Sequence, residues 1–256
     1  MSPSPRDRFI TVYGRQPVLE ALADGRLEID KVLLARTARG PAAEEILRAA
    51  AARGVPVERP SPDRVSRISG NGRHDQGVVC DVVAPGLGVL DEWVPPAGPC
   101  AVLVLDGVTN PGNVGMVVRT ATAAGLAGVV LPRVGAPDVG PLVIKASAGV
   151  AFRATILRSD TAVDAVRRLR ALEFDVVGLR GDDPTGARPP TPDLFGSPLP
   201  DRAAYVLGNE TDGVSPAVAA EVTSWRSLPL ANGVESLNVA VAAGVVAYEV
   251  RRRASG

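Results

Sequence analysis

The sequence predicts an α/β protein in which a small N-terminal unit precedes a larger unit with a mostly parallel sheet. Predicted strands alternate with predicted helices through both units, as in parallel sheets covered on both faces. Between the two series, residues 84–99 read "APGLGVLDEWVPPAGP", a proline- and glycine-rich composition typical of a linker. We therefore place the N-terminal unit at 1–85, the linker at 86–98 and the larger unit at 99–256.

Local signals predict the elements of the N-terminal unit. Residues 41–54, "PAAEEILRAAAARG", are predicted to be helical because a proline opens them and a glycine closes them. Residues 61–69 are predicted to form a helix capped by Ser61, with Pro62 at its first position. The remaining helix is expected at 14–23, and the strands are expected at 29–35, 55–58 and 77–83.

The larger unit continues the alternation. Its strands are predicted at 101–105, 128–131, 174–179, 203–207 and 226–230, and its helices at 113–124, 161–172, 216–222 and 237–252. A proline-rich segment at 181–200 is expected to be a surface loop. Because ligands of open α/β sheets bind beyond the carboxyl ends of the strands, we expect a site at the loops after residues 105, 207 and 230.

Composition indicates a soluble globular protein. The chain is 46% hydrophobic and 22% charged, and no stretch approaches the ~20 apolar residues of a membrane span. The opening residues "MSPSPRDRFI" lack the apolar core of a signal peptide, so we expect a cytoplasmic location. Basic and acidic residues both number 28, so net charge neither supports nor excludes nucleic-acid binding.

Cysteine and histidine are too scarce for common metal and nucleophile sites. The sequence contains Cys80, Cys100 and His74 and no others of these types, whereas a structural zinc site needs about four ligands. We therefore expect no metal. A serine or cysteine nucleophile would have to use His74 as its base, and the sequence lacks the G-x-S-x-G turn that presents such a serine.

The loop after residue 105 combines asparagines, glycines and an arginine-bearing helix. It reads "DGVTNPGNVGMVVRTATAAG" (106–125), with Asn113 near the helix start and Arg119 inside the helix. Its amides are able to cradle a phosphate, although it matches neither a Walker A loop nor G-x-G-x-x-G; an asparagine-capped turn is the alternative. Because a buried, unpaired arginine is costly, Arg119 either faces solvent or has a function.

Polar residues follow the next two strand ends as well. In "YVLGNETDGVSPAV" (205–218), Glu210 follows a strand directly and is either an acid/base or binding group or a solvated loop residue. In "SLPLANGVESLNVAVAAG" (227–244), Ser236 and Asn238 precede an uncharged helix, where they either cap the helix or face a site. Three such loops at three strand ends favour a site.

Together the three loops resemble the SpoU (TrmH) family of the SPOUT superfamily, whose members are S-adenosylmethionine-dependent RNA 2′-O-ribose methyltransferases. "NPGNVGMVVRTATAAG" is similar to the family's first motif, "VLGNETDGVS" to its second and "LPLANGVESLNVAVAAGVVAYE" to its third, in the expected order. In the N-terminal unit, "VYGRQPVLEALA" and "RHDQGVVCDV" resemble the substrate-binding domain of many members, which is similar to a ribosomal-protein-like RNA-binding module.

The resemblance implies a fold that patterning alone does not predict. Periodicity by itself favours a Rossmann-like sheet, and general topology rules disfavour knots. The family's C-terminal segment nevertheless forms a trefoil knot whose loops hold the cofactor in a bent form, and its active site forms across a homodimer. We therefore expect an α/β SPOUT domain with a trefoil knot and a mostly parallel sheet, preceded by a small α/β RNA-binding domain.

The resemblance also implies roles for particular residues. Catalytic roles fall on Asn113, Arg119, Glu210, Ser236 and Asn238, with Arg119 at the position that activates the ribose 2′-hydroxyl. S-adenosylmethionine is expected to be held, largely through backbone and apolar contacts, by Leu207, Gly208, Asn209, Leu228, Leu230, Ser236 and Leu237. Leu230 departs from a methionine of many relatives, and "ETDGVS" departs from the commoner "EGEGLS", which bears more on the RNA target than on the chemistry.

The implied reaction is methyl transfer to a ribose 2′-hydroxyl of structured RNA without a metal. Because arginine normally stays protonated, general chemistry favours oxyanion stabilisation by Arg119, whereas the family assignment favours activation. Ribosomal RNA is the preferred substrate, transfer RNA is the alternative, and antibiotic-resistance methylation stays open. A non-catalytic RNA-binding protein would show altered motif residues, and a nicotinamide-dependent dehydrogenase a glycine fingerprint after its first strand; the sequence has neither feature.

Overall fold

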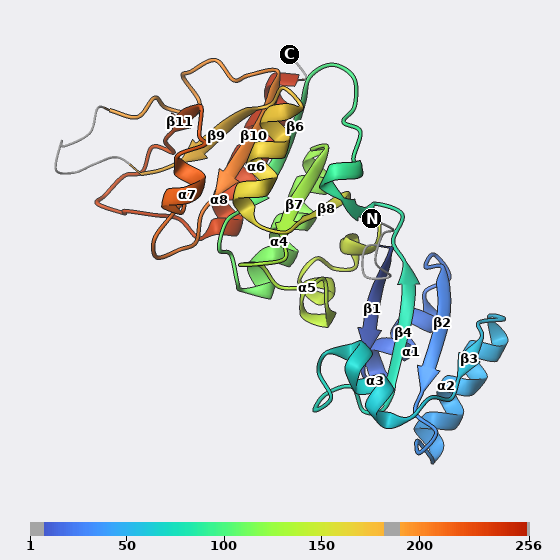
Figure 1. Ribbon diagram of the computed structural model, residues 1–256. Helices are drawn as coiled ribbons and strands as arrows, with labels where there is room; N and C mark the ends of the chain where they lie inside the picture. Colours follow the sequence, from blue (N-terminus) through green and yellow to red (C-terminus); the bar gives the residue numbers. More distant parts are fainter. Residues whose placement is uncertain (1–7, 182–189, 255–256) are drawn as a thin grey trace.

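Two β-sheets organise the chain. The computed structural model describes residues 8–181 and 190–254. A four-stranded sheet has the order β1-β4-β2-β3, and a seven-stranded sheet has the order β11-β9-β10-β6-β7-β8-β5. Figure 1 shows the small sheet beside the large one, each with its own helices.

The small sheet belongs to the N-terminal part. It is formed by β1 (Phe9–Tyr13), β2 (Ile29–Leu34), β3 (Val57–Glu58) and β4 (Val78–Val83), and its helices are α1 (Arg15–Ala23), α2 (Pro41–Ala52) and α3 (Pro62–Ser69). Successive side chains of a strand face opposite sides: Val32 lies in the cluster that contains α1 and α2, whereas Leu33 packs with Val65 of α3. Ser61 Oγ accepts a hydrogen bond from the Arg64 amide at 3.4 Å, which confirms the predicted cap.

The large sheet is parallel between every pair of neighbouring strands, which confirms the predicted mostly parallel sheet. Its strands are β5 (Leu87–Val89), β6 (Cys100–Leu105), β7 (Gly128–Pro132), β8 (Ile156–Ser159), β9 (Asp175–Leu179), β10 (Arg202–Leu207) and β11 (Ser224–Arg226). Its helices are α4 (Pro111–Ala124), α5 (Pro141–Ala146), α6 (Ala162–Ala171), α7 (Pro216–Ala219) and α8 (Val239–Ala254), with short 3-10 turns η2 (Leu90–Glu92) and η3 (Val150–Phe152).

Helices cover both faces of the large sheet. Leu103 of β6 lies in one core cluster with Val117 of α4 and Val246 of α8, and its neighbour Val102 lies in a second cluster with Leu169 of α6. Because both faces are covered, β6 is an unbroken apolar run. This arrangement leaves the carboxyl ends of the strands free to carry loops.

The segment 86–98, predicted as a linker, is partly built into the large sheet. β5 pairs in parallel with β8, and η2 follows it. Leu90 is 1% exposed, and a Cβ added at Gly86 would lie 2.4 Å from the carbonyl oxygen of Ala154. The prolines and glycines of this stretch obscured its buried leucines, because they are typical of linkers.

Other differences concern short elements. β1, β8 and α5 were not predicted, while the third site strand ends at Arg226 instead of residue 230 and α7 ends at Ala219 instead of residue 222. Such short elements carry too few residues for a clear period. The predicted surface loop at 181–200 lies partly outside the described residues.

Candidate active site

The three polar loops lie at one edge of the large sheet. β6 and β10 are neighbours in register, so Leu105 pairs with Leu207 and the loops that follow leave side by side. β11 lies on the other side of β9 and runs in the same direction. Parallel topology thus brings together segments that are about a hundred residues apart in the chain.

A chain of hydrogen bonds joins one residue from each loop. Asn113 Nδ2 donates to Glu210 Oε1, and Asn238 Nδ2 donates to Asn113 Oδ1 at 3.1 Å. A carboxylate only accepts hydrogen bonds, so Glu210 fixes which end of the Asn113 amide faces it. Asn113 is 7% exposed, so its side chain is a buried connection between the three predicted motifs.

The capping interpretation holds for two of the asparagines. Asn110 Oδ1 accepts from the amides of Gly112 and Asn113 at 2.8 and 3.3 Å and thereby caps α4. This cap leaves the Asn113 side chain available for the site. Asn238 Oδ1 accepts from the Ala240 amide at 2.9 Å at the start of α8, so Asn238 is both a cap and a member of the hydrogen-bonded chain.

Arg119 is not brought to this cluster within one chain. It is exposed on α4 and follows Asn113 by six positions, which places the two side chains about 120° apart around the helix axis. Across residues 8–181 and 190–254, no hydrogen bond or ion pair involves it. The sequence left two alternatives for Arg119, exposure to solvent or a function. In the single chain, Arg119 faces solvent.

A cavity of about 620 Å³ opens beside the cluster. All of the residues predicted to hold the cofactor line it: Leu207, Gly208, Asn209, Leu228, Leu230, Ser236 and Leu237. Glu210 lines it too, and Leu230 is an apolar part of its wall. Its size falls in the range of small-molecule sites.

The wall formed by residues 208–215 is a tightly closed loop. A Cβ at Gly208 would lie 2.0 Å from the carbonyl carbon of Gly213, so only glycine allows this approach. Asn209 and Gly213 exchange two backbone hydrogen bonds of 3.1 Å. The Asn209 side chain is used within the loop, where its Oδ1 accepts from the amides of Thr211 and Asp212 at 2.8 and 2.7 Å.

Sequence reasoning missed Asp106 and Arg180. Asp106 is 8% exposed at the end of β6, and its carboxylate accepts from the Ser215 amide at 2.7 Å, which ties the loop to the neighbouring strand. Arg180 lines the cavity at the end of β9. The signal for both was their place directly after a predicted strand: Asp106 opens the first of the three polar loops, and Arg180 follows the strand predicted at 174–179, whose end was not expected to contribute to the site.

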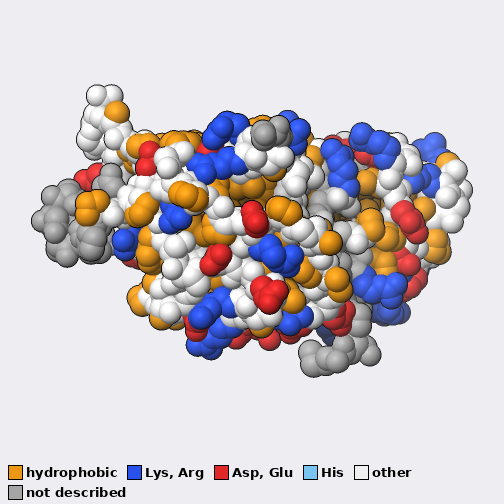
Figure 2. Space-filling model, turned by 90° about the horizontal axis from the view of Figure 1, so that it is seen from above, with side chains coloured by type: hydrophobic (Ala, Val, Ile, Leu, Met, Phe, Trp, Pro, Cys, Tyr) orange, Lys and Arg blue, Asp and Glu red, His pale blue; other side chains and the backbone are white. Residues whose placement is uncertain are grey.

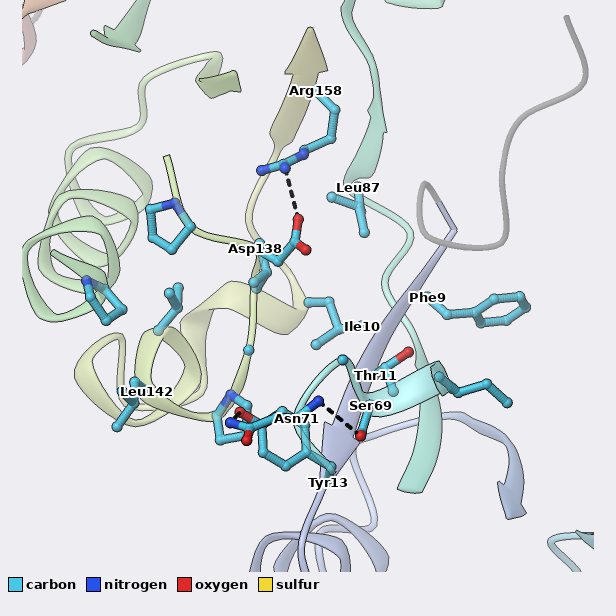
Figure 3. Close-up of a pocket in the computed structure, with 18 of the residues that line it drawn as sticks. Phe9, Ile10, Thr11, Tyr13, Ser69, Asn71, Leu87, Asp138, Leu142 and Arg158 are labelled. Carbon is cyan, nitrogen blue, oxygen red and sulfur yellow. Dashed lines mark hydrogen bonds and ion pairs between the residues drawn. The ribbon is translucent and has the colours of Figure 1, made fainter. Parts of the chain in front are cut away.

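A second cavity, of about 520 Å³, lies where the two sheet systems meet. Figure 3 shows Tyr13, Ser69 and Asn71 of the small-sheet part on one side and Asp138, Leu142 and Arg158 of the large-sheet part on the other. Arg158 Nη2 and Asp138 Oδ1 form an ion pair at 2.9 Å there. The predicted site residues do not line this cavity.

The cysteines lie away from the site. Cys80 is buried in β4, and burial raises the pKa of its thiol to about 12, which leaves it unreactive. Cys100 lies at the start of β6, at the opposite end of the strand from the site. In residues 8–181 and 190–254, no group of three His, Cys, Asp or Glu side chains is arranged to hold a metal ion.

Comparison with known proteins assigns both parts of the chain. Residues 101–248 match the SpoU rRNA Methylase family, and residues 11–86 match the family described as RNA 2′-O ribose methyltransferase substrate binding. The chain belongs to the SpoU rRNA methylase family. It is an S-adenosylmethionine-dependent RNA 2′-O-ribose methyltransferase.

Relatives of this SpoU-family chain match it along nearly its whole length. The 23S rRNA (guanosine-2′-O-)-methyltransferase RlmB of Neisseria meningitidis serogroup B is 32% identical over 94% of both chains. That of Ralstonia nicotianae is 33% identical over 95% of this chain and 96% of its own. The crystal structure of an AdoMet-bound rRNA methyltransferase from Sinorhizobium meliloti superposes with a TM-score of 0.64 at 27% identity, covering 96% of this chain and 88% of that one.

The cavity of this SpoU-family enzyme fits S-adenosylmethionine. Gly208 and Gly213 both line the cavity, and their close approach folds the loop that forms its wall. The leucines of the wall suit an apolar and aromatic ligand, and Glu210, Asp212 and Glu235 give it a negative side for a sulfonium. None of the helices in the described part of the chain is long and apolar enough to cross a membrane.

Proposed function

We propose that the enzyme methylates the ribose 2′-hydroxyl of a guanosine in 23S ribosomal RNA. The observation that carries this proposal is the hydrogen-bonded chain of Glu210, Asn113 and Asn238 beside the cofactor cavity. The target follows from relatives named as 23S rRNA (guanosine-2′-O-)-methyltransferases, which cover 94% or more of this chain.

The residues act mainly by positioning. The bound cofactor supplies a methyl group already activated by the sulfonium. Methyl transfer from the bound cofactor to the ribose 2′-hydroxyl would release S-adenosylhomocysteine, and the hydroxyl proton would pass to solvent water. Asn113, Glu210 and Asn238 hold the edge of the site rigid, and Ser236 faces the cavity, so that the ribose is held in line with the methyl group.

In the proposed homodimer, Arg119 of one subunit acts on the ribose 2′-hydroxyl that the other subunit binds. Exposed apolar side chains flank it on the face formed by α4 and α8: Met116 is 43% exposed, and Val241 and Tyr248 are each 52% exposed. Covering this face with a second copy would bury apolar surface and bring Arg119 toward the partner's ribose site. A guanidinium there would stabilise the developing oxyanion.

The small-sheet part is proposed to grip RNA phosphates. β1, β2 and β3 run in the same direction, so Arg15, Arg36, Arg39 and Arg59, which follow these strands, gather at one end of the sheet. All four are exposed. Arg39 and Arg59 donate to the carbonyls of Arg36 and Ala38 at 2.9 and 3.1 Å, which leaves their charges free for phosphate.

Charge elsewhere is mixed. Figure 2 shows basic and acidic side chains interspersed over the face seen from above, in keeping with equal numbers of the two.

We propose the division into an RNA-binding part at 1–85, a connection at 86–98 and a catalytic part at 99–256. We further propose that the loops from β10 and β11, which wall one cavity, belong to a trefoil knot, and that the enzyme acts in the cytoplasm, where its ribosomal substrate is found.

The test is methylation of defined RNA. The full-length protein would be incubated with S-adenosylmethionine carrying a labelled methyl group and transcripts of 23S rRNA, 16S rRNA or transfer RNA, and the modified nucleoside would be identified by mass spectrometry. We expect 2′-O-methylguanosine in one 23S fragment, and no product when the target ribose is 2′-deoxy. Methylation confined to transfer RNA, or on a base, would contradict the proposal.

A further inference from the structure

One cation stands in the cofactor cavity. Among the described residues that line it, Arg180 is the single lysine or arginine, while Glu210, Asp212 and Glu235 are acidic. Arg180 follows β9, which lies between β10 and β11 in the sheet. It therefore stands between the two strands whose loops form the cavity wall.

The Arg180 side chain is held in place by its surroundings. Its Nε donates to Thr191 Oγ1 at 2.8 Å, and its guanidinium lies 4.9 Å from the centre of the Trp225 ring. Its backbone amide donates to the Arg226 carbonyl at 3.1 Å, continuing the pairing of β9 with β11. A guanidinium stacked on an indole and bonded at Nε has lost most of its freedom before any ligand arrives.

A glycine makes this support possible. A Cβ at Gly178 would lie 2.6 Å from two atoms of the Trp225 ring, so glycine lets the indole lie against the strand. Of the three guanidinium nitrogens, Nε donates to Thr191. The two terminal nitrogens have no hydrogen-bond partner in the part of the chain that the structure describes. This edge of a guanidinium is suited to binding a carboxylate through two parallel hydrogen bonds.

We infer that Arg180 binds the carboxylate of the methionyl group of S-adenosylmethionine. The inference rests on the methyltransferase activity proposed above, because it needs that cofactor. The cofactor brings two cationic groups, its sulfonium and its ammonium, and one anionic carboxylate. The acidic side chains of the cavity suit the cations and repel the carboxylate, whereas Arg180 is the side chain that attracts it.

Two ligands separate this role from a general effect on the cavity. S-adenosylhomocysteine carries the amino-acid group, and 5′-methylthioadenosine has the same nucleoside and thioether without it. Calorimetry on the full-length protein would compare wild type, Arg180→Ala and Arg180→Lys. Arg48→Ala removes an exposed arginine on α2 and serves as the matched control.

We expect Arg180→Ala to weaken S-adenosylhomocysteine by about tenfold to a hundredfold, with methylthioadenosine affinity unchanged and Arg180→Lys intermediate. Equal weakening of both ligands would overturn the inference, since Arg180 would then only support the wall. Unchanged affinity for both would also overturn it. Because these titrations contain no RNA, a wrong RNA target would not alter their result.

Discussion

At the scale of single residues, the buried amide of Asn113 connects the site. It accepts from Asn238 and donates to Glu210, so one side chain of α4 orients residues from two distant loops. Its direction is set by charge, because a carboxylate cannot donate. The hydrogen-bonded chain can therefore be tested by replacing the donor of Asn113 with an acceptor.

Asn113→Asp keeps the shape of the side chain and places a carboxylate against Glu210. We expect the free energy of unfolding to fall by about 1–2 kcal/mol, because two acceptors then face each other. Glu210→Gln in the same chain restores a donor, so the double variant should recover most of the loss. Urea denaturation of the two single variants and the double variant measures the coupling, and simple additivity would argue against the hydrogen-bonded chain.

Arg119→Ala tests the proposed role of the exposed arginine. Loss of an oxyanion-stabilising group typically costs 10²- to 10³-fold in rate, so we expect methyl transfer to fall by at least about a hundredfold. Binding of S-adenosylhomocysteine should stay within about twofold, because Arg119 does not line the cavity. Rates would be measured with saturating RNA, and activity equal to that of wild type would remove Arg119 from the mechanism.

At the scale of elements, the loop after β10 depends on Gly208. A Cβ there meets the backbone of Gly213 at 2.0 Å, so Gly208→Ala must open the loop that walls the cavity. We expect at least about tenfold weaker binding of S-adenosylhomocysteine and about 1–3 kcal/mol lower stability. Gly25→Ala is the control, since nothing lies within 4 Å of the added Cβ; identical behaviour of the two variants would contradict the close approach.

The end of α8 is fixed by a buried carboxylate. Glu249 pairs with Arg252 and Arg253 at 2.8 and 2.6 Å. Arg253 also donates to the carbonyls of Ser197, Leu194 and Phe195. The side-chain hydrogen bond from Arg252 is the main cause that lowers the pKa of Glu249 from 4.5 to about 2. The stabilisation from this group is therefore complete above about pH 4.5 and is lost as the pH falls toward 2.

Glu249→Gln should destabilise the protein by about 2 kcal/mol at pH 7, and the deficit should shrink between pH 4.5 and pH 2. Urea unfolding midpoints measured across this range give the comparison. Glu45→Gln, at an exposed position of α2, controls for the loss of one negative charge. A deficit that does not change with pH would show that ionisation of Glu249 is not its source.

At the scale of the whole molecule, the face of α4 and α8 is the proposed homodimer surface. It carries Met116, Val241 and Tyr248 beside Arg119. Together these three side chains expose apolar surface on one face, because Met116 is 43% exposed and Val241 and Tyr248 are each 52% exposed, and a partner would cover this surface. The same surface would complete the site, so assembly and activity should fail together.

Val241→Glu places a charge in this surface. We expect wild type to sediment as a dimer and the variant as a monomer with little methyl transfer, because a buried unpaired carboxylate strongly disfavours association. Val134→Glu, at a valine that is 70% exposed outside this face, should remain dimeric and active. A wild-type monomer that is fully active would contradict the dimer.

Local chemistry in the sequence determined much of this protein. Alternating elements predicted the parallel sheet, Ser61 and the asparagine-rich turn before α4 predicted caps, and strand ends indicated where the candidate site lies. The residues predicted for the cofactor all line one cavity. Such features could be predicted because capping, turn formation and apolar runs depend on neighbours in the chain.

Tertiary structure decided what depends on residues far apart. It made β5 an edge strand inside a stretch that resembled a linker, since pairing with β8 outweighed composition. It made Asn110 the cap of α4, bonded Asn113 to Glu210, and left Arg119 exposed on α4. It also placed Arg180 in the cavity, because the order β11-β9-β10 inserts β9 between the two strands that carry the wall. Strand order is set by packing across the whole sheet, which no local pattern encodes.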